Sequence, residues 1–190
     1  MRRLAIAVAC IWVGAASAAA PNAEMVRQLD EIGRVGTVMV DGDACQRIMS
    51  ERALGFMGKI DPKDPYLASD NFDVNDEPYN QVKKTLIRLS KLAPFPADVN
   101  LWMLIESRPG KIQVLIRNVH EMSQFWRWGA IDQDTPGPMK TVLADGKRVT
   151  VTNRPGWVSV LAPVYNSLGD IVGLVEAVAQ ENPDLRENVK

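Results

Sequence analysis

The sequence predicts an α+β domain in which helices come first and an antiparallel sheet follows. Two observations support this prediction. The spacing of apolar residues changes from three or four to two at about Leu101, and two Pro-Gly turns separate apolar runs after that point. With 190 residues, 46% hydrophobic and 24% charged, the composition is that of one globular domain. The net charge of −1 leaves no basic excess, so we expect no nucleic-acid partner.

Residues 1–18 have the pattern of a signal peptide. Two arginines precede an apolar run, residues 4–15, and Ala16-Ser17-Ala18 supplies the small residues that a signal peptidase recognises. We expect cleavage after Ala18, which predicts a periplasmic or secreted protein with no stable membrane span. The apolar run over residues 4–20 is 17 residues long, the lower limit for crossing a bilayer, so an uncleaved anchor is the alternative.

Few residues of this chain have the chemistry of catalysis. The mature chain keeps one cysteine, Cys45, and one histidine, His120, which excludes a disulfide framework and a Cys/His zinc site. No phosphate-binding glycine loop, G-x-S-x-G or H-E-x-x-H motif is present. We interpret Cys45 as a buried apolar residue and His120 as a surface or structural one. We therefore expect no enzyme, no metal site and no cofactor, the alternative being an enzyme that uses Cys45 or His120.

Four helices are predicted from apolar spacing and capping residues. The first covers residues 24–40, and Asp41 begins a second that continues to about Met57. A third begins at Glu77-Pro78 and ends before Pro94, and a short fourth covers about residues 138–144. The acid-rich residues 61–77 are predicted as a surface loop, because their spacing is not that of a calcium-binding loop.

Five strands are predicted, with an apolar and a mixed face. Residues 101–106 and 112–119 form a hairpin around Pro109-Gly110, and residues 148–153, 157–166 and 171–179 form a three-stranded meander. If Pro109 and Gly110 are the central turn residues, Ile105 pairs with Val114. This register places Met103 and Val114 on the apolar face. It places the following residues on the mixed face: Trp102, Leu115, Thr150, Thr152, Ser159, Leu161, Leu174 and Glu176.

The order of these elements resembles the single Cache domain, a PAS-like sensor fold found outside the cytoplasm. The stretch TNRPGWVSVLAPVYNSLGDIVGLVEAVA is similar to the closing strands of that family. The resemblance covers roughly residues 24–180 and leaves 181–190 as a polar tail. It implies a five-stranded antiparallel sheet of order 2-1-5-4-3, with the N-terminal helices packed on one face and a small-molecule pocket on the other.

Cache sensors usually continue into a transmembrane helix and a cytoplasmic signalling module, whereas only the polar tail follows the last strand here. We therefore expect a sensory role to pass through a partner, such as a membrane receptor or another signalling protein.

Aromatic and arginine side chains of the mixed face and of the insert after it are the predicted ligand contacts. Arginine can hold a carboxylate through two hydrogen bonds, and aromatic walls supply apolar area. Within the insert, Arg127-Trp128 resembles the arginine and aromatic ligands of amino-acid-binding Cache domains, although Gly129 stands where a second aromatic would help. The full predicted set is Trp102, Arg117, Trp126, Arg127, Trp128, Trp157 and Tyr165.

Together these features predict an exported, stand-alone domain that binds a small carboxylate or amino-acid-like metabolite. The alternative is a structural or partner-binding PAS-like domain with no small ligand, in which the mixed face or the acid-rich loop at residues 61–77 is an interface. In that case the aromatic residues of the insert are core or edge residues.

Overall fold

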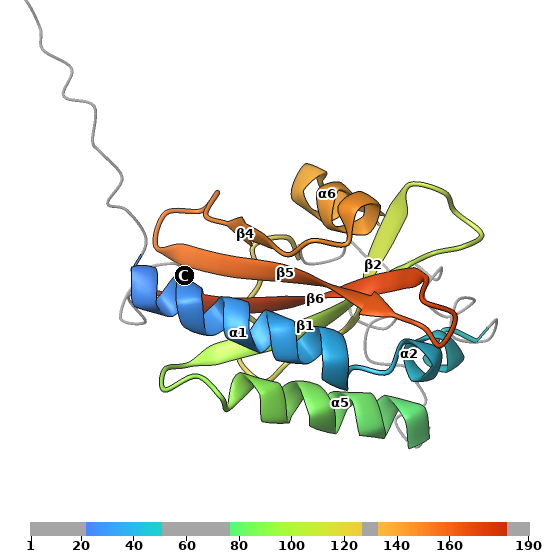
Figure 1. Ribbon diagram of the computed structural model, residues 1–190, viewed down its shortest axis with the longest axis horizontal. Helices are drawn as coiled ribbons and strands as arrows, with labels where there is room; N and C mark the ends of the chain where they lie inside the picture. Colours follow the sequence, from blue (N-terminus) through green and yellow to red (C-terminus); the bar gives the residue numbers. More distant parts are fainter. Residues whose placement is uncertain (1–21, 51–76, 127–132, 182–190) are drawn as a thin grey trace, which may run out of the picture.

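The computed structural model describes residues 22–50, 77–126 and 133–181, and the elements of these ranges are shown in Figure 1. The predicted signal peptide, most of the acid-rich loop, the polar tail after Glu181 and the pair Arg127-Trp128 lie outside the described residues. The helices are α1 (Ala23–Met39), α2 (Gly42–Ile48), α5 (Glu77–Ser90) and α6 (Gly137–Asp145). The strands are β1 (Ala97–Leu104), β2 (Lys111–Ile116), β3 (Gln133–Asp134), β4 (Val149–Val151), β5 (Trp157–Tyr165) and β6 (Ile171–Gln180).

The described residues form an α+β fold with one antiparallel sheet of order β3-β2-β1-β6-β5-β4. The sheet has six strands, one more than expected, because the two residues of β3 pair with the start of β2. Periodicity could not predict β3, since a two-residue strand is too short to show alternation.

Capping side chains begin the first two helices. Asn22 accepts hydrogen bonds from the backbone N–H groups of Glu24 and Met25 at the start of α1, and Asp41 accepts one from Ala44 at the start of α2. The predicted cap at Asp41 is therefore confirmed. Helix α2 ends at Ile48, and residues 51–57 of the predicted second helix lie outside the described residues.

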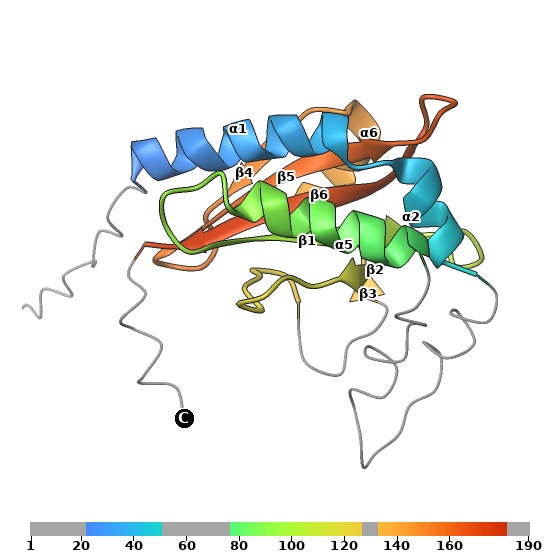
Figure 2. The same cartoon turned by 90° about the horizontal axis from the view of Figure 1, so that it is seen from below.

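Helices α1, α2 and α5 cover one face of the sheet, and α1 and α5 lie side by side along it (Figures 1 and 2). Their buried residues, among them Leu29, Cys45 and Leu86, pack on the apolar side chains of β1, β5 and β6. This is the main core. The opposite face, called here the second face, carries a smaller core in which Trp102, Leu161 and Leu174 pack with α6.

The hairpin between β1 and β2 has the predicted turn but a different register. The Lys111 N–H donates to the Arg108 carbonyl, with Gly110 at a φ of 80°, a conformation that favours glycine. A further bond from the Arg108 N–H to the Ile105 carbonyl lengthens the loop, so Val114 pairs with Trp102 instead of Ile105.

This change in register exchanges the faces of Val114 and Leu115, because the three-residue difference at Val114 is odd, whereas the irregularity between Leu101 and Trp102 leaves Ile116 in the main core with Met103, as predicted. Val114 lies on the second face and Leu115 in the main core, the reverse of the prediction. The same exchange occurs in β4, where Val151 pairs with Ser159 and packs on the second face in place of Thr150 and Thr152. The predicted faces of β5 and β6 are confirmed, with Val160 and Val175 in the main core and Leu161 and Leu174 on the second face.

Candidate functional site

Buried polar side chains of β1 hold the segment after β2 against the second face. Asp98 accepts hydrogen bonds from the backbone N–H groups of His120 (3.2 Å) and Met122 (2.9 Å). Asn100 donates to the Met122 carbonyl (2.6 Å) and accepts from the Asn118 N–H (3.0 Å). These side chains supply the partners that an irregular backbone needs when it is buried without a strand beside it. The segment is therefore fixed on the sheet.

Glu176 continues this arrangement from β6 and is fully buried. Its two carboxyl oxygens accept four hydrogen bonds: from Trp102 Nε1 (3.1 Å) and Ser123 Oγ (2.6 Å) on one oxygen, and from Gln124 N and Ser159 Oγ (2.9 Å each) on the other. Burial raises the pKa of Glu176 above its ordinary value, and the hydrogen bonds oppose this shift without reversing it. The carboxyl group joins the sheet to residues 123–124 and has no free side for a ligand.

A cavity of about 510 Å³ lies on the second face, beyond this anchored segment. Its volume is within the range of small-molecule pockets, roughly 300–1,000 Å³. Four parts of the chain line it: the end of the anchored segment, β3, the start of α6 and the end of β4. The lining residues are Gln124, Phe125, Gln133, Asp134, Pro136, Gly137, Pro138, Val151 and Asn153.

Two donor groups without a described partner lie at the wall formed by β3 and α6. Helix α6 starts after Pro136 without a side-chain cap, and of the residues of its first turn that line the cavity only Gly137 has a backbone N–H, since Pro138 has none. The side-chain Nε2 of Gln133 is buried and has no hydrogen-bond partner in the described part of the chain. An anionic group in the cavity would satisfy both features, since helix N-termini and amide N–H groups bind anions.

The carboxylate of Asp134 lies at the same wall. Asp134 lines the cavity and forms an ion pair with Lys111, whose Nζ lies 3.0 Å from Oδ1. This hydrogen bond lowers the pKa of Asp134, which is therefore ionised at neutral pH. The cavity combines donors for an anion with a negative charge that a ligand ammonium group could approach.

The predicted ligand residues within the described ranges do not form a single cluster. Trp102 is in the core, 1% exposed, with its ring edge-to-face against Phe125 at 6.5 Å. Trp157 and Tyr165 are the first and last residues of β5, which places them about 26 Å apart at 3.3 Å per residue. Trp157 lies under the Arg154 guanidinium, and the Tyr165 hydroxyl donates to the Gly146 carbonyl.

Arg117 and Trp126 are the two predicted residues that the structure brings together. The Arg117 guanidinium lies over the Trp126 ring, 4.7 Å from its centroid, and its Nη1 is 3.3 Å from Glu121 Oε1. Lys83 of α5 donates to the Arg117 carbonyl, and burial lowers the pKa of this lysine. Trp126 follows Phe125, a residue of the cavity wall, but neither Trp126 nor Arg117 is among the residues that line the cavity.

Sequence reasoning missed both the donor wall and Glu176 as an anchor. The sequence did contain a signal for each. The helix after Pro136 begins with no Ser, Thr, Asp or Asn at its cap position, and Glu176 is a lone acid inside the apolar run IVGLVEAVA. Neither signal shows where the side chain points, and that depends on the packing of segments distant in sequence.

Cys45 is fully buried in the main core, where burial and the nearby Asp41 carboxylate raise the pKa of its thiol to about 12. Since the thiolate is the reactive form, we expect no labelling of Cys45 by a maleimide at pH 7 in the native protein and full labelling of Cys45 in 6 M guanidinium chloride. Mass spectrometry of the two samples measures both. Rapid labelling of the native protein would contradict this assignment and restore Cys45 as a candidate nucleophile.

Fold and site together define an α+β domain whose sheet is covered by helices on one face and hollowed on the other by a donor-lined cavity. A scan against models of known protein families finds no match, and a search of curated proteins finds no significantly similar sequence. In the described ranges no helix is long and apolar enough to span a membrane, and no group of three or more metal-ligating side chains occurs.

Proposed function

We propose that this protein is an exported, Cache-like sensor domain that binds a small carboxylate or amino-acid-like metabolite and acts through a partner protein. The observation that supports it most directly is the cavity on the second face, with the uncapped start of α6 and the unpaired amide of Gln133 in its wall. A carboxylate placed there would accept hydrogen bonds from both.

The strand arrangement also supports this proposal. Without the two-residue β3, the sheet order is β2-β1-β6-β5-β4. This corresponds to the order 2-1-5-4-3 of the Cache resemblance when the remaining strands are numbered along the chain. In that fold the ligand pocket lies on the face opposite the long helices, which is the position of the cavity relative to α1 and α5.

Charge favours a zwitterion over a simple carboxylate. Asp134 is ionised, and its side chain is 91% exposed, whereas that of its Lys111 partner is 38% exposed. An α-amino acid could therefore place its carboxylate at the α6 end of the cavity and its ammonium group toward Asp134. In this orientation the side chain of the ligand would point toward the Arg117–Trp126 pair.

A thermal-shift screen of amino acids and small carboxylates tests the proposal. We expect at least one compound to raise the melting temperature, because a ligand at 100 times its Kd adds about 2.7 kcal/mol of stability. Gln133→Leu is expected to abolish the shift with little loss of stability, since the amide Nε2 has no partner to lose. Arg117→Ala is expected to reduce ligand affinity.

Gln81→Leu is the matched control, because Gln81 is an exposed glutamine on α5, on the other side of the sheet. It should leave the shift unchanged. A broad screen without any shift, together with co-purification of a stoichiometric protein partner, would instead favour a partner-binding domain. If Gln133→Leu and Arg117→Ala both bind ligand like the wild type, the ligand site is elsewhere.

A further inference from the structure

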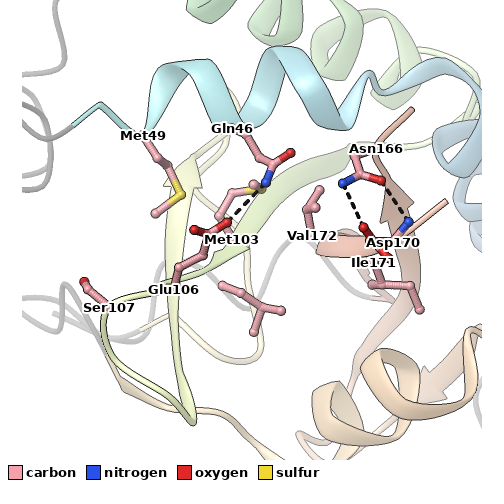
Figure 3. Close-up of a pocket in the computed structure, with 10 residues that line it drawn as sticks. Gln46, Met49, Met103, Glu106, Ser107, Asn166, Asp170, Ile171 and Val172 are labelled. Carbon is pink, nitrogen blue, oxygen red and sulfur yellow. Dashed lines mark hydrogen bonds between the residues drawn. The ribbon is translucent and has the colours of Figure 1, made fainter. Parts of the chain in front are cut away.

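A second cavity, of about 700 Å³, opens at the end of the sheet between the β1–β2 loop, the β5–β6 turn and α2 (Figure 3). Its floor includes Met103 and Val172, which belong to the main core, whereas Phe125 and Val151 of the first cavity pack with the smaller core of the second face. The two cavities share no lining residue and are therefore separate sites.

The walls of this second cavity carry negative charge on both sides of an apolar floor. Glu106 comes from the β1–β2 loop and Asp170 from the β5–β6 turn, and Figure 3 shows Met103 and Val172 between them. Neither acid has an ion pair with a described residue. Each accepts a hydrogen bond from a neutral amide, Gln46 at 3.3 Å and Asn166 at 3.4 Å.

The wall that carries Asp170 and the floor of the cavity are held in place by contacts within the fold. Asn166 Oδ1 accepts hydrogen bonds from the N–H groups of Leu168 and Asp170, and the Asp43 carboxylate of α2 accepts two from Ser167. At the floor the backbones of β1 and β6 approach so closely that a Cβ on Gly173 would lie 2.4 Å from the Trp102 carbonyl oxygen. The floor and the turn that carries Asp170 are thus preformed.

We propose that this cavity binds a small aliphatic amine, and a short diamine in particular. Two ammonium groups would lie at Glu106 and Asp170, and the methylene chain between them would cover Met103 and Val172. None of the described residues that line the cavity is a lysine, arginine or histidine, so no described side chain of the lining competes for these carboxylates. A small anion would be repelled from the same walls.

Isothermal titration of the full chain with 1,4-diaminobutane tests this proposal, with butane-1,4-diol and succinate as uncharged and anionic probes of similar length. We expect the diamine to bind and the other two probes not to bind. Glu106→Gln and Asp170→Asn should each weaken diamine binding about fivefold, the upper end of the value of an exposed ion pair, and the double variant should weaken it about 25-fold if the effects add. Added NaCl should weaken it further.

Glu24→Gln is the matched control, because Glu24 is an exposed acid in the first turn of α1. It should bind the diamine like the wild type, as should Gln133→Leu, which separates this proposal from that of the carboxylate site. Equal binding of diamine and diol, unchanged binding in the double variant, or equal weakening by Glu24→Gln would each overturn the proposal.

Discussion

Trp102→Ala is expected to lower the free energy of unfolding by about 4 kcal/mol. The indole is 1% exposed, packs against Phe125, and donates its Nε1–H to Glu176. Truncating a buried tryptophan leaves a cavity and typically costs about 3–5 kcal/mol. In this case the substitution also removes one of the hydrogen bonds to the buried carboxyl. Urea denaturation followed by circular dichroism measures the change.

Two further variants help to interpret the loss of stability in Trp102→Ala. Trp102→Phe keeps most of the apolar volume and removes the N–H donor, so we expect a cost of about 1–2 kcal/mol. Trp126→Ala removes an indole that is only half-buried, and it should cost less than Trp102→Ala. If Trp102→Ala were no more destabilising than Trp126→Ala, Trp102 would not be a core residue, and its prediction as a ligand contact would regain support.

Glu176→Gln is expected to cost about 2 kcal/mol although it keeps the size and shape of the side chain. Each carboxyl oxygen faces one group that can only donate: Trp102 Nε1 on one side and the Gln124 N–H on the other. The new NH₂ group must therefore meet a donor in either orientation of the amide, which leaves a buried donor unpaired at a cost of about 1–3 kcal/mol. Glu176→Ala should cost more, about 3 kcal/mol, because it leaves both donors without partners.

The same carboxyl predicts a pH dependence. Its pKa is raised in the folded protein, so its contribution to stability is fully present below the ordinary pKa of 4.5 and decreases as the pH rises through the folded value. The difference in stability between wild type and Glu176→Ala should therefore shrink with rising pH. Denaturation curves between pH 4 and pH 9 measure this difference.

Glu31→Gln is the control for both experiments, since Glu31 is half-exposed and its ion pair with Arg34 is worth little. A Glu176→Gln variant as stable as the wild type would mean that the buried network tolerates an amide. A difference that grows with pH would show that Glu176 is stabilised in its charged form.

Local chemistry was enough to predict most of the elements. Apolar residues at helical spacing predicted α1 and α5, Asp41 predicted a cap, and alternation predicted the faces of β5 and β6. These features depend on neighbours within one or two turns of chain. The β1–β2 register could not be predicted in this way, because the additional turn at Ile105–Arg108 depends on how the loop packs.

The candidate site was harder to predict from the sequence than the fold. The aromatic and arginine pattern included Arg117 and Trp126, which lie in contact, but it also included Trp102, whose indole is directed to Glu176, a residue 74 positions away in the sequence. Trp157 and Tyr165 share a strand yet stand at its two ends. The donor groups of Gln133 and of the uncapped start of α6 belong to residues that are neither aromatic nor charged, so the aromatic and arginine pattern did not include them.

By itself, the sequence determined the α+β class, the first helix to within a residue of its start at Ala23, the cap at Asp41 and the two-faced character of β5 and β6, because backbone conformation and amphipathic spacing are local properties. The tertiary structure alone decided which polar groups are buried together, which faces of β2 and β4 point inward, and where the two cavities lie. These features depend on the pairing register of the strands, since a shift of one or three residues moves a side chain to the other face, and on contacts between segments distant in the sequence. No local pattern encodes either of them.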